Sequence, residues 1–369
     1  MFGRQYFTNT WIIKNSKLIY RIARGFFRGL VLRRNTLKVI ELFPTFQCNS
    51  VCSMCSVAKF RQPCKTELSL DDYRRIADEA VDMGAIAMVL LGGEPTLCPH
   101  VEGIIRIFKE RSFFVSMVSN SLLFSRERAL SLKQAGLDSV YFSLESLDAE
   151  TNDAIRGVPG HHASVMRGIE SAKAAKLDVG LATVILPGRM DRFKEVLRYC
   201  AEHGLLCSGG ELAPVGAAAA QSELVSEEEN REIRGLLRKH SRLTFDWGLS
   251  YFMRCRCPAG KEKLGITCYG DVIGCSLSPI SFGNVLREPL KAIWQRMGGF
   301  SQFKKDSPRC LSAADKGFIA GYIAPLDLID ANPVPFDRHP NMTRAKEPGL
   351  YGGEQPKRGG CAACGAAKG

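Results

Sequence analysis

Three cysteines near the start of the chain have a spacing suited to chemistry. Cys48, Cys52 and Cys55 stand in the order Cys-Asn-Ser-Val-Cys-Ser-Met-Cys. Thiolates at this spacing can ligate three of the four irons of a cubane iron–sulfur cluster and leave the fourth iron open to a ligand that is not protein. The competing interpretation is structural zinc, which takes four protein ligands, and Cys64 is the only further cysteine nearby. We therefore predict that the triplet binds a 4Fe-4S cluster and is the catalytic centre.

A second set of cysteines lies near the end of the chain. Cys257 and Cys275 are separated by a Cys-x12-Gly-x4-Cys pattern, in which Gly270 can turn a hairpin whose two arms bring both thiols to one metal. Cys310 follows as a third ligand, and a zinc ribbon is the alternative. Four residues are candidates for the fourth ligand: Cys255, Cys268, Cys361 and Cys364. Four others are expected to be small, buried apolar residues: Cys64, Cys98, Cys200 and Cys207.

The fourteen cysteines lie in short clusters, and the N-terminus lacks the compact apolar core and cleavage site of a secretory signal. This distribution indicates metal binding in a reducing compartment rather than a disulfide framework. No run of about eighteen or more uncharged apolar residues is present, so the sequence offers no candidate membrane-spanning helix. We expect a cytoplasmic protein whose membrane contact, if any, is with the inner face.

The elements that must position these cysteines alternate along the chain. Short runs that are apolar throughout are separated by amphipathic helical segments such as Ser69–Met83 and Arg126–Ala135. This alternation indicates βαβ units and a parallel sheet buried on both faces. Six units without a dinucleotide fingerprint after the first favour an α/β fold with a partial (β/α)6 barrel of the TIM type over a doubly wound sheet. The expected strands are 38–43, 86–91, 113–118, 138–143, 178–184 and 205–212.

Composition divides the chain into four segments. We predict a basic amphipathic segment at residues 1–37, the partial barrel at 38–245, a small Cys-rich domain at 250–312, and a loop-rich tail at 313–369.

Glycines and polar residues follow the expected strands where each strand ends. Because the carboxyl ends of parallel strands meet at one rim of a barrel, these residues are expected to gather around the cysteine triplet. Gly92-Gly93-Glu94-Pro95 follows the second strand, Asn120 follows the third, Ser143 and Glu145 follow the fourth, and Arg156 lies in the next helical segment.

In type and order these motifs resemble those of the radical S-adenosylmethionine (radical SAM) superfamily. The triplet resembles its cluster-binding signature, and Gly92 to Pro95 resembles the loop that holds the amino group of SAM. The resemblance covers about residues 38–216. It implies a 4Fe-4S cluster and SAM as cofactors, and cleavage of SAM to a 5′-deoxyadenosyl radical that takes hydrogen from a substrate.

The same resemblance gives roles to the other polar residues. Ser143 and Glu145 are similar to the segment that holds the ribose and backbone of SAM. Arg156, within Asp-x-x-Arg-Gly, is similar to the arginine that meets its carboxylate, and Asn120 to a polar strand end near the substrate.

The C-terminal cysteines, together with Phe282-Gly283-Asn284, resemble the auxiliary-cluster extension called SPASM, or its shortened form, Twitch. The resemblance implies a single auxiliary 4Fe-4S cluster with Cys257, Cys275 and Cys310 as ligands.

The N-terminal segment has nine Lys or Arg and no acidic residue in its first 40 positions, in a chain of net charge +12. Basic residues at 14, 17, 21, 24 and 28 fall on one stripe of a helix. Such a helix is typical of a contact with an anionic membrane surface. The alternative is a helix packed on the barrel, with its basic face in water. The opposite face would carry Ile12, Ile19, Ile22, Ala23, Phe26, Phe27 and Leu30.

From the resemblance we expect a radical SAM oxidoreductase. If the N-terminal helix lies on a membrane, the favoured substrate is a lipid or lipid-linked molecule. A peptide-modifying SPASM maturase is the alternative within the class, and a non-catalytic iron–sulfur or zinc scaffold is the alternative from another class. An electron donor such as flavodoxin or ferredoxin is an expected partner. No nucleic acid is expected, because most of the net positive charge comes from the first 40 residues and the rest of the chain offers no basic patch.

Overall fold

A curved sheet runs through the molecule, and strands from both halves of the chain contribute to it. The computed structural model describes residues 15–62, 64–221, 223–245, 256–329 and 331–351. Among these residues the sheet has eleven strands, in the order β11-β10-β9-β8-β1-β2-β3-β4-β5-β6-β7. The sequence therefore folds around one continuous sheet rather than around a barrel with a separate appendage.

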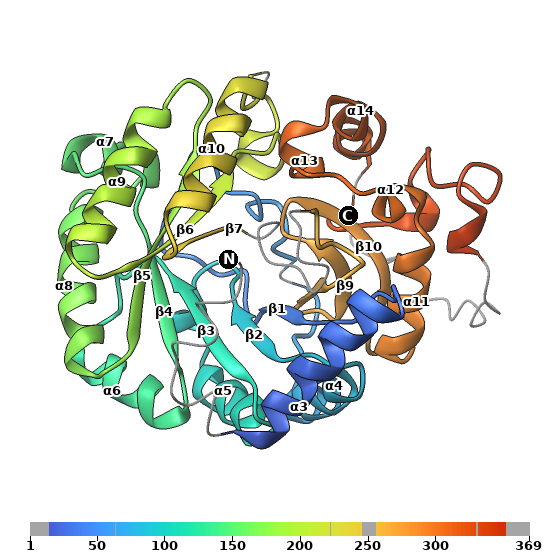
Figure 1. Ribbon diagram of the computed structural model, residues 1–369, viewed down its shortest axis with the longest axis horizontal. Helices are drawn as coiled ribbons and strands as arrows, with labels where there is room; N and C mark the ends of the chain where they lie inside the picture. The colour runs from blue at the N-terminus through green and yellow to red at the C-terminus, as the bar shows by residue number, and fades with distance from the viewer. Residues whose placement is uncertain (1–14, 63, 222, 246–255, 330, 352–369) are drawn as a thin grey trace, which may run out of the picture.

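Strands β1 to β7 are parallel and form the partial barrel (Figure 1). The α/β class and the six expected strands are confirmed. A seventh short strand, β7, was not expected and pairs with β6. The strands are β1 (Val39–Phe43), β2 (Ala87–Leu90), β3 (Phe114–Ser119), β4 (Ser139–Ser143), β5 (Asp178–Ile185), β6 (Leu206–Glu211) and β7 (Leu243–Phe245).

Helices cover the outside of the barrel, as Figure 1 shows. The helices are α4 (Leu70–Asp82), α5 (Val101–Glu110), α6 (Arg126–Ala135), α7 (Ala149–Arg156), α8 (His161–Ala174), α9 (Met190–Glu202) and α10 (Glu227–Lys239). Side chains cap the starts of α4, α6, α7 and α10. At α4 the Ser69 hydroxyl accepts from the Asp72 N–H, and the Asp72 carboxylate accepts from the Ser69 N–H.

The C-terminal region extends the barrel sheet at its first strand. Strand β8 (Lys263–Thr267) pairs in parallel with β1, and β9 (Asp271–Cys275) and β10 (Ser278–Asn284) continue as antiparallel neighbours. Ion pairs join Lys38 to Glu262 at 3.1 Å and Glu41 to Lys263 at 2.9 Å, all of them buried. The remaining elements are α11 (Leu290–Gly299), α12 (Ser301–Lys304), α13 (Leu311–Ala314), α14 (Lys316–Phe318) and β11 (Val334–Pro335).

Residues 313–351, expected to be a loop-rich tail, consist of short helical turns that pack on this region. Phe318, Ile323, Met342 and Leu350 are buried there. The segment therefore belongs to the folded core.

The N-terminal helix α3 (Ser16–Phe26) packs across the amino ends of β1 to β3, where Leu18 and Ile22 contact Ile86 and Ala87. The predicted basic stripe is wrong at Arg21. This side chain is buried, and its guanidinium donates to the carbonyls of Ala85, Arg111 and Ser112. Ile12 and Lys14 lie outside the described residues.

The opposite side of α3 and the π-helical turn after it (Phe27–Val31) remains exposed. Six of the ten large hydrophobic residues found exposed in the described part of the chain lie here. We call this set the outer face: Ile19, Tyr20, Phe27, Leu30, Val31 and Leu32. Exposed basic residues, Lys17, Arg33 and Arg34, flank it. The helix is thus both packed on the barrel and apolar toward solvent.

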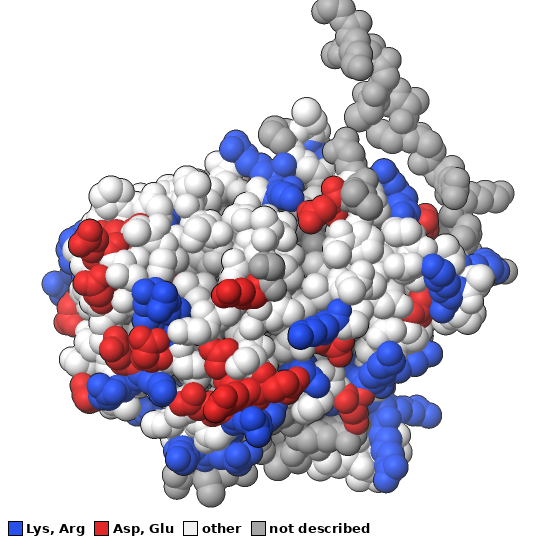
Figure 2. Space-filling model, turned by 90° about the horizontal axis from the view of Figure 1, so that it is seen from above, with Lys and Arg blue, Asp and Glu red and all other residues white. Residues whose placement is uncertain are grey.

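Charges of both signs are interspersed over the face of the molecule seen in Figure 2, with uncharged areas between them. No helix in the described ranges has both the length and the apolar character needed to cross a membrane.

Candidate active site

The cysteine triplet lies on the loop that follows β1, at the carboxyl rim of the barrel. Cys48 is exposed, and Cys52 and Cys55 are half-buried. Two glycines let neighbouring segments approach this loop closely. A Cβ atom on Gly93 would overlap the Gln47 carbonyl, and one on Gly216, whose φ is 62°, would overlap the Cys55 carbonyl. The loop is therefore held from two sides by backbone.

Glu94 organises the adjacent rim. Its buried carboxylate accepts from the Thr96 N–H and hydroxyl, the Ser119 hydroxyl at 2.9 Å and the Asn120 N–H at 2.7 Å. Burial raises the pKa of Glu94, and these donors oppose that rise. Since both carboxylate oxygens are engaged within the protein, Glu94 positions the ends of β2 and β3.

Asn120 connects this rim to the cysteine loop. Its amide nitrogen donates to the Asn49 side-chain oxygen at 2.7 Å and to the Ser50 hydroxyl at 3.2 Å, and it lies 3.8 Å from the Cys48 sulfur. The predicted strand-end residue and the predicted cluster ligand are thus brought together.

Glu145 and Arg156 form an ion pair of 3.3 Å on the other side of the loop. Glu145 also accepts from the Val184 N–H at 2.7 Å, which ties β4 to β5. Burial raises the pKa of Glu145, while Arg156 acts in the opposite direction. The buried Nε–H of Arg156 has no acceptor among the described residues, so this guanidinium has hydrogen-bonding capacity beyond Glu145. Ser143 ends β4 and is half-buried.

Burial raises the pKa of the Cys52 thiol to about 11, and the Arg156 charge opposes that rise. Metal binding would release the proton, because the thiolate is the ligand. The arginine beside the triplet therefore also favours the charge state that an iron cluster needs.

The three predicted ligands of the auxiliary cluster lie close to one another in the C-terminal region. Cys257, Cys275 and Cys310 lie near enough to affect one another's pKa, and burial raises the pKa of Cys275 to about 12. Among the described residues, no three His, Cys, Asp or Glu side chains meet as ligands of one metal ion do.

The register of the hairpin excludes Cys268 as a fourth ligand. Gly265 pairs with Ile273, which places Cys275 opposite Lys263. Cys268 lies at the other end of β8, about 17 Å away at 3.3 Å per residue. It is buried among aromatic side chains, including Phe43 and Tyr269. The other candidates, Cys255, Cys361 and Cys364, lie outside the described residues.

The expectation for Cys64 is wrong, because this residue is exposed. It lies in a turn after the cysteine loop, where no helix covers it. Burial of Cys98, Cys200 and Cys207 is confirmed.

Three buried charged residues near the auxiliary set were not predicted. Glu41 and Lys263 lie beside Cys275, and Glu211 lies beside Cys310. A signal for the first existed, since Glu41 is a lone carboxylate within an apolar strand. Lys263 and Glu211 could not be predicted without knowing that β8 pairs with β1.

Comparison with known proteins identifies the two regions that contain these cysteines. Residues 42–200 match the model of the radical SAM superfamily, and residues 255–313 match the SPASM iron–sulfur cluster-binding domain. The chain belongs to the radical SAM superfamily. It is a radical SAM enzyme with a C-terminal SPASM domain, a SAM-binding 4Fe-4S cluster and an auxiliary iron–sulfur cluster. The individual ligand assignments above remain predictions.

Relatives in this superfamily act on different substrates. The radical SAM chain is 26% identical to an AdoMet-dependent heme synthase of Nitratidesulfovibrio vulgaris, over 73% of this chain and 82% of that protein. It is 25% identical to a PqqA peptide cyclase of Streptomyces rochei, over 72% and 77%. The fold resembles that of SuiB from Streptococcus suis bound to its precursor peptide SuiA, with a TM-score of 0.58, 16% identity, and coverage of 74% and 67%.

The residues present fit the cofactors. When bound, the cluster and SAM supply a 5′-deoxyadenosyl radical. The Cys48 loop offers three thiols for the cluster. The spare donor capacity of Arg156 suits the carboxylate of SAM. Glu94 and Asn120 hold the surrounding loops in register, which is the positioning that such chemistry requires.

Proposed function

We propose that this radical SAM enzyme oxidises a lipid-linked substrate at a membrane surface. The observation that carries the proposal is the outer face of α3, an exposed apolar surface in a segment that has no acidic residue before position 41. Apolar side chains flanked by Lys17, Arg33 and Arg34 suit the interface of an anionic membrane.

The auxiliary site supports oxidation as the reaction type. Cys275 lies beside Lys263 and Glu41 at the sheet, and Cys310 lies beside Glu211 at the carboxyl end of β6. Glu41 and Glu211 belong to barrel strands, which supports a position of the auxiliary cluster near the barrel. When bound there, an auxiliary cluster would supply an electron acceptor. A substrate that gave a hydrogen atom to the 5′-deoxyadenosyl radical, one electron to this acceptor and one proton to water would undergo a two-electron oxidation. A flavodoxin or ferredoxin is the proposed source of the electron that cleaves SAM.

The geometry narrows the substrate class. Helix α3 lies at the amino ends of the strands, whereas the cysteine triplet follows their carboxyl ends. Five residues of β1 alone separate the two levels by about 17 Å. A molecule anchored in the membrane must span this depth to reach the radical. An extended group carried on a lipid meets this requirement better than a simple lipid does.

Two alternative substrate classes are favoured by the relatives. The heme synthase suggests a tetrapyrrole, and the peptide cyclase suggests a peptide, because each covers most of the radical SAM chain. At sequence identities of about 25%, neither relative fixes the substrate of this chain. The turnover assay described below therefore includes both substrate classes.

The test combines membrane binding with turnover. We expect Ile19→Ser with Phe27→Ser to weaken binding to vesicles of phosphatidylglycerol about tenfold, since about 1.4 kcal/mol of lost apolar burial is a factor of ten. SAM cleavage, measured as 5′-deoxyadenosine, should be unchanged. Leu130→Ser with Leu286→Ser is the matched control, since these residues are similarly exposed elsewhere.

Turnover with deuterated membrane extracts should transfer deuterium into 5′-deoxyadenosine. Equal vesicle binding by both double variants would contradict the membrane contact. Deuterium transfer from a deuterated tetrapyrrole or peptide, and none from lipid extract, would contradict the substrate class.

A further inference from the structure

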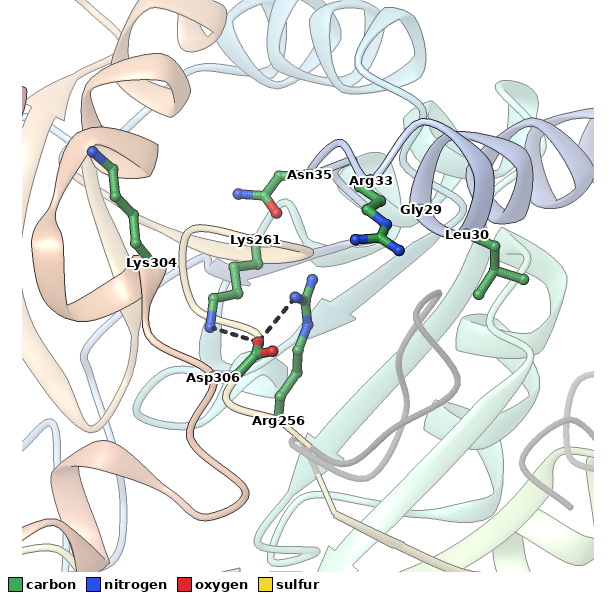
Figure 3. A pocket seen from close by; sticks show the side chains of 8 residues that line it. All are labelled: Gly29, Leu30, Arg33, Asn35, Arg256, Lys261, Lys304 and Asp306. Carbon is green, nitrogen blue, oxygen red and sulfur yellow. Dashed lines mark hydrogen bonds and ion pairs between the residues drawn. The ribbon is translucent and has the colours of Figure 1, made fainter.

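A basic cavity lies between the N-terminal segment and the SPASM region. Its volume is about 650 Å³, within the range of small-molecule sites. Figure 3 shows the side chains that line it, which come from the segment after α3, the segment before β8, and the end of α12 with the residues that follow it. We call it the basic pocket, lined by Gly29, Leu30, Arg33, Asn35, Arg256, Lys261, Lys304 and Asp306.

The lining has four cationic groups and one carboxylate. Asp306 lies 3.4 Å from Arg256 and 4.0 Å from Lys261, and both cations are buried. Arg256 also pairs with Glu262 at 3.3 Å, and the Lys261 ammonium donates to the Lys305 carbonyl. Arg33 and Lys304 have no side-chain partner among the described residues. The positive charge of the pocket therefore exceeds what its own carboxylate can balance.

The backbone at Arg33 is in an unusual conformation. Its φ is 51°, in the left-handed region that is unfavourable for a non-glycine residue. The bend follows the π-helical turn and places Arg33 at the pocket. Figure 3 shows the guanidinium groups of Arg33 and Arg256 pointing toward each other. Strained backbone is often retained at ligand sites, and the positive charge of Arg33 suits an anionic ligand.

The pocket is distinct from the SAM site. Arg33 and Asn35 precede β1, and Arg256 and Lys261 precede β8, which runs parallel to β1. Both pairs therefore lie at the amino ends of the strands, opposite the cysteine loop. Leu30 belongs both to the pocket and to the outer face, so the cavity adjoins the surface proposed to meet the membrane.

We propose that the basic pocket binds the phosphate of an anionic phospholipid headgroup while the outer face contacts the acyl region. The inference rests on the membrane contact proposed above, but not on the identity of the substrate. A phosphate there would accept from Arg33 and Lys304, and the acyl chains would lie beside Leu30. The chain would thus bind the headgroup of one lipid in the pocket, while the outer face contacts the surrounding membrane without lipid specificity.

The experiment separates a specific pocket from general charge. Arg33→Gln with Lys304→Gln removes two pocket cations. The matched control, Arg34→Gln with Lys305→Gln, removes two exposed charges next to them that do not line the pocket. Binding is measured with the full chain, on vesicles of phosphatidylglycerol and of phosphatidylcholine, and by calorimetry with glycerol 3-phosphate and inorganic phosphate.

We expect the pocket variant to lose about tenfold more affinity for phosphatidylglycerol vesicles than the control, the effect of about one charge-assisted hydrogen bond. It should also lose binding of glycerol 3-phosphate. Equal losses in both variants would overturn the pocket. Loss of phosphate binding in the pocket variant, with equal vesicle affinities, would assign the pocket to free phosphate and overturn the lipid. If the pocket fails while a lipid-linked substrate is still oxidised, the proposed function stands.

Discussion

At the scale of single residues, the site depends on a buried chain of hydrogen bonds behind Glu145. The Glu145 N–H donates to the Asn152 side-chain oxygen at 3.1 Å, and the Asn152 amide nitrogen lies 3.1 Å from Nδ1 of His161. Because the amide nitrogen donates, Nδ1 must accept and the imidazole must be neutral. His161 is fully buried, and burial lowers its pKa to about 4.

This histidine predicts a loss of stability in mild acid. Between pH 6.5, where the unfolded histidine titrates, and the folded pKa of about 4, only the unfolded state binds the proton. The free energy of unfolding should therefore fall as the pH falls, by about 2 kcal/mol from pH 7 to pH 5. Urea unfolding measures it. His161→Gln should lose this part of the pH dependence and His162→Gln should retain it. Equal pH dependence in both variants would show that His161 does not titrate in this way.

Residue types and spacing predicted which side chains lie together at the carboxyl rim. They did not predict which of these side chains are engaged by other protein groups. Glu94 was expected to bind cofactor, and the structure shows its carboxylate occupied by Thr96, Ser119 and Asn120. A sequence motif predicts which residue type stands in a loop. Which of its atoms face the ligand depends on donors from other strands, and those donors lie 2 to 26 positions away in sequence.

At the scale of elements, the register of β8 and β9 decides which cysteines can share a cluster. We expect Cys275→Ala to lose the auxiliary cluster and Cys268→Ala to keep it, because these residues lie at opposite ends of the hairpin. Iron analysis of the reconstituted protein should therefore give about four fewer irons in the first variant only, since a cubane holds four. Loss of iron in Cys268→Ala would contradict the register.

Helix α3 shows what periodicity leaves undetermined. The spacing of basic residues predicted a helix, and the helix is present from residue 16. Its rotation against the barrel was not predictable, because three carbonyls at the amino ends of β2 and β3 accept from Arg21. These carbonyls belong to loops far from α3 in the sequence. The spacing of residues within α3 therefore gives no information about them. The helix consequently turns Ile19 and Phe27 outward.

At the scale of the whole molecule, the barrel and the SPASM region share their hydrophobic core as well as their sheet. Phe43, Phe46 and Phe60 pack with Tyr269 and Ile273 across the β1–β8 junction. The six barrel strands were predictable from apolar runs. The pairing of β8 with β1 was not predictable, because the sequence of β8 indicates only one arm of a hairpin. Such an arm can pair with any exposed edge strand of the sheet.

This junction predicts that the two regions unfold together. Separation would expose the aromatic cluster and break the Lys38–Glu262 and Glu41–Lys263 ion pairs, both of which are buried in the folded chain. Hydrogen exchange in rising urea should therefore report the same opening free energy for β1–β6 and for β8–β10. A chain ending at residue 245 should aggregate through the uncovered edge of β1. Opening of β8–β10 several kcal/mol below β1–β6, together with a well-folded truncated chain, would show instead that the SPASM region is an independent domain.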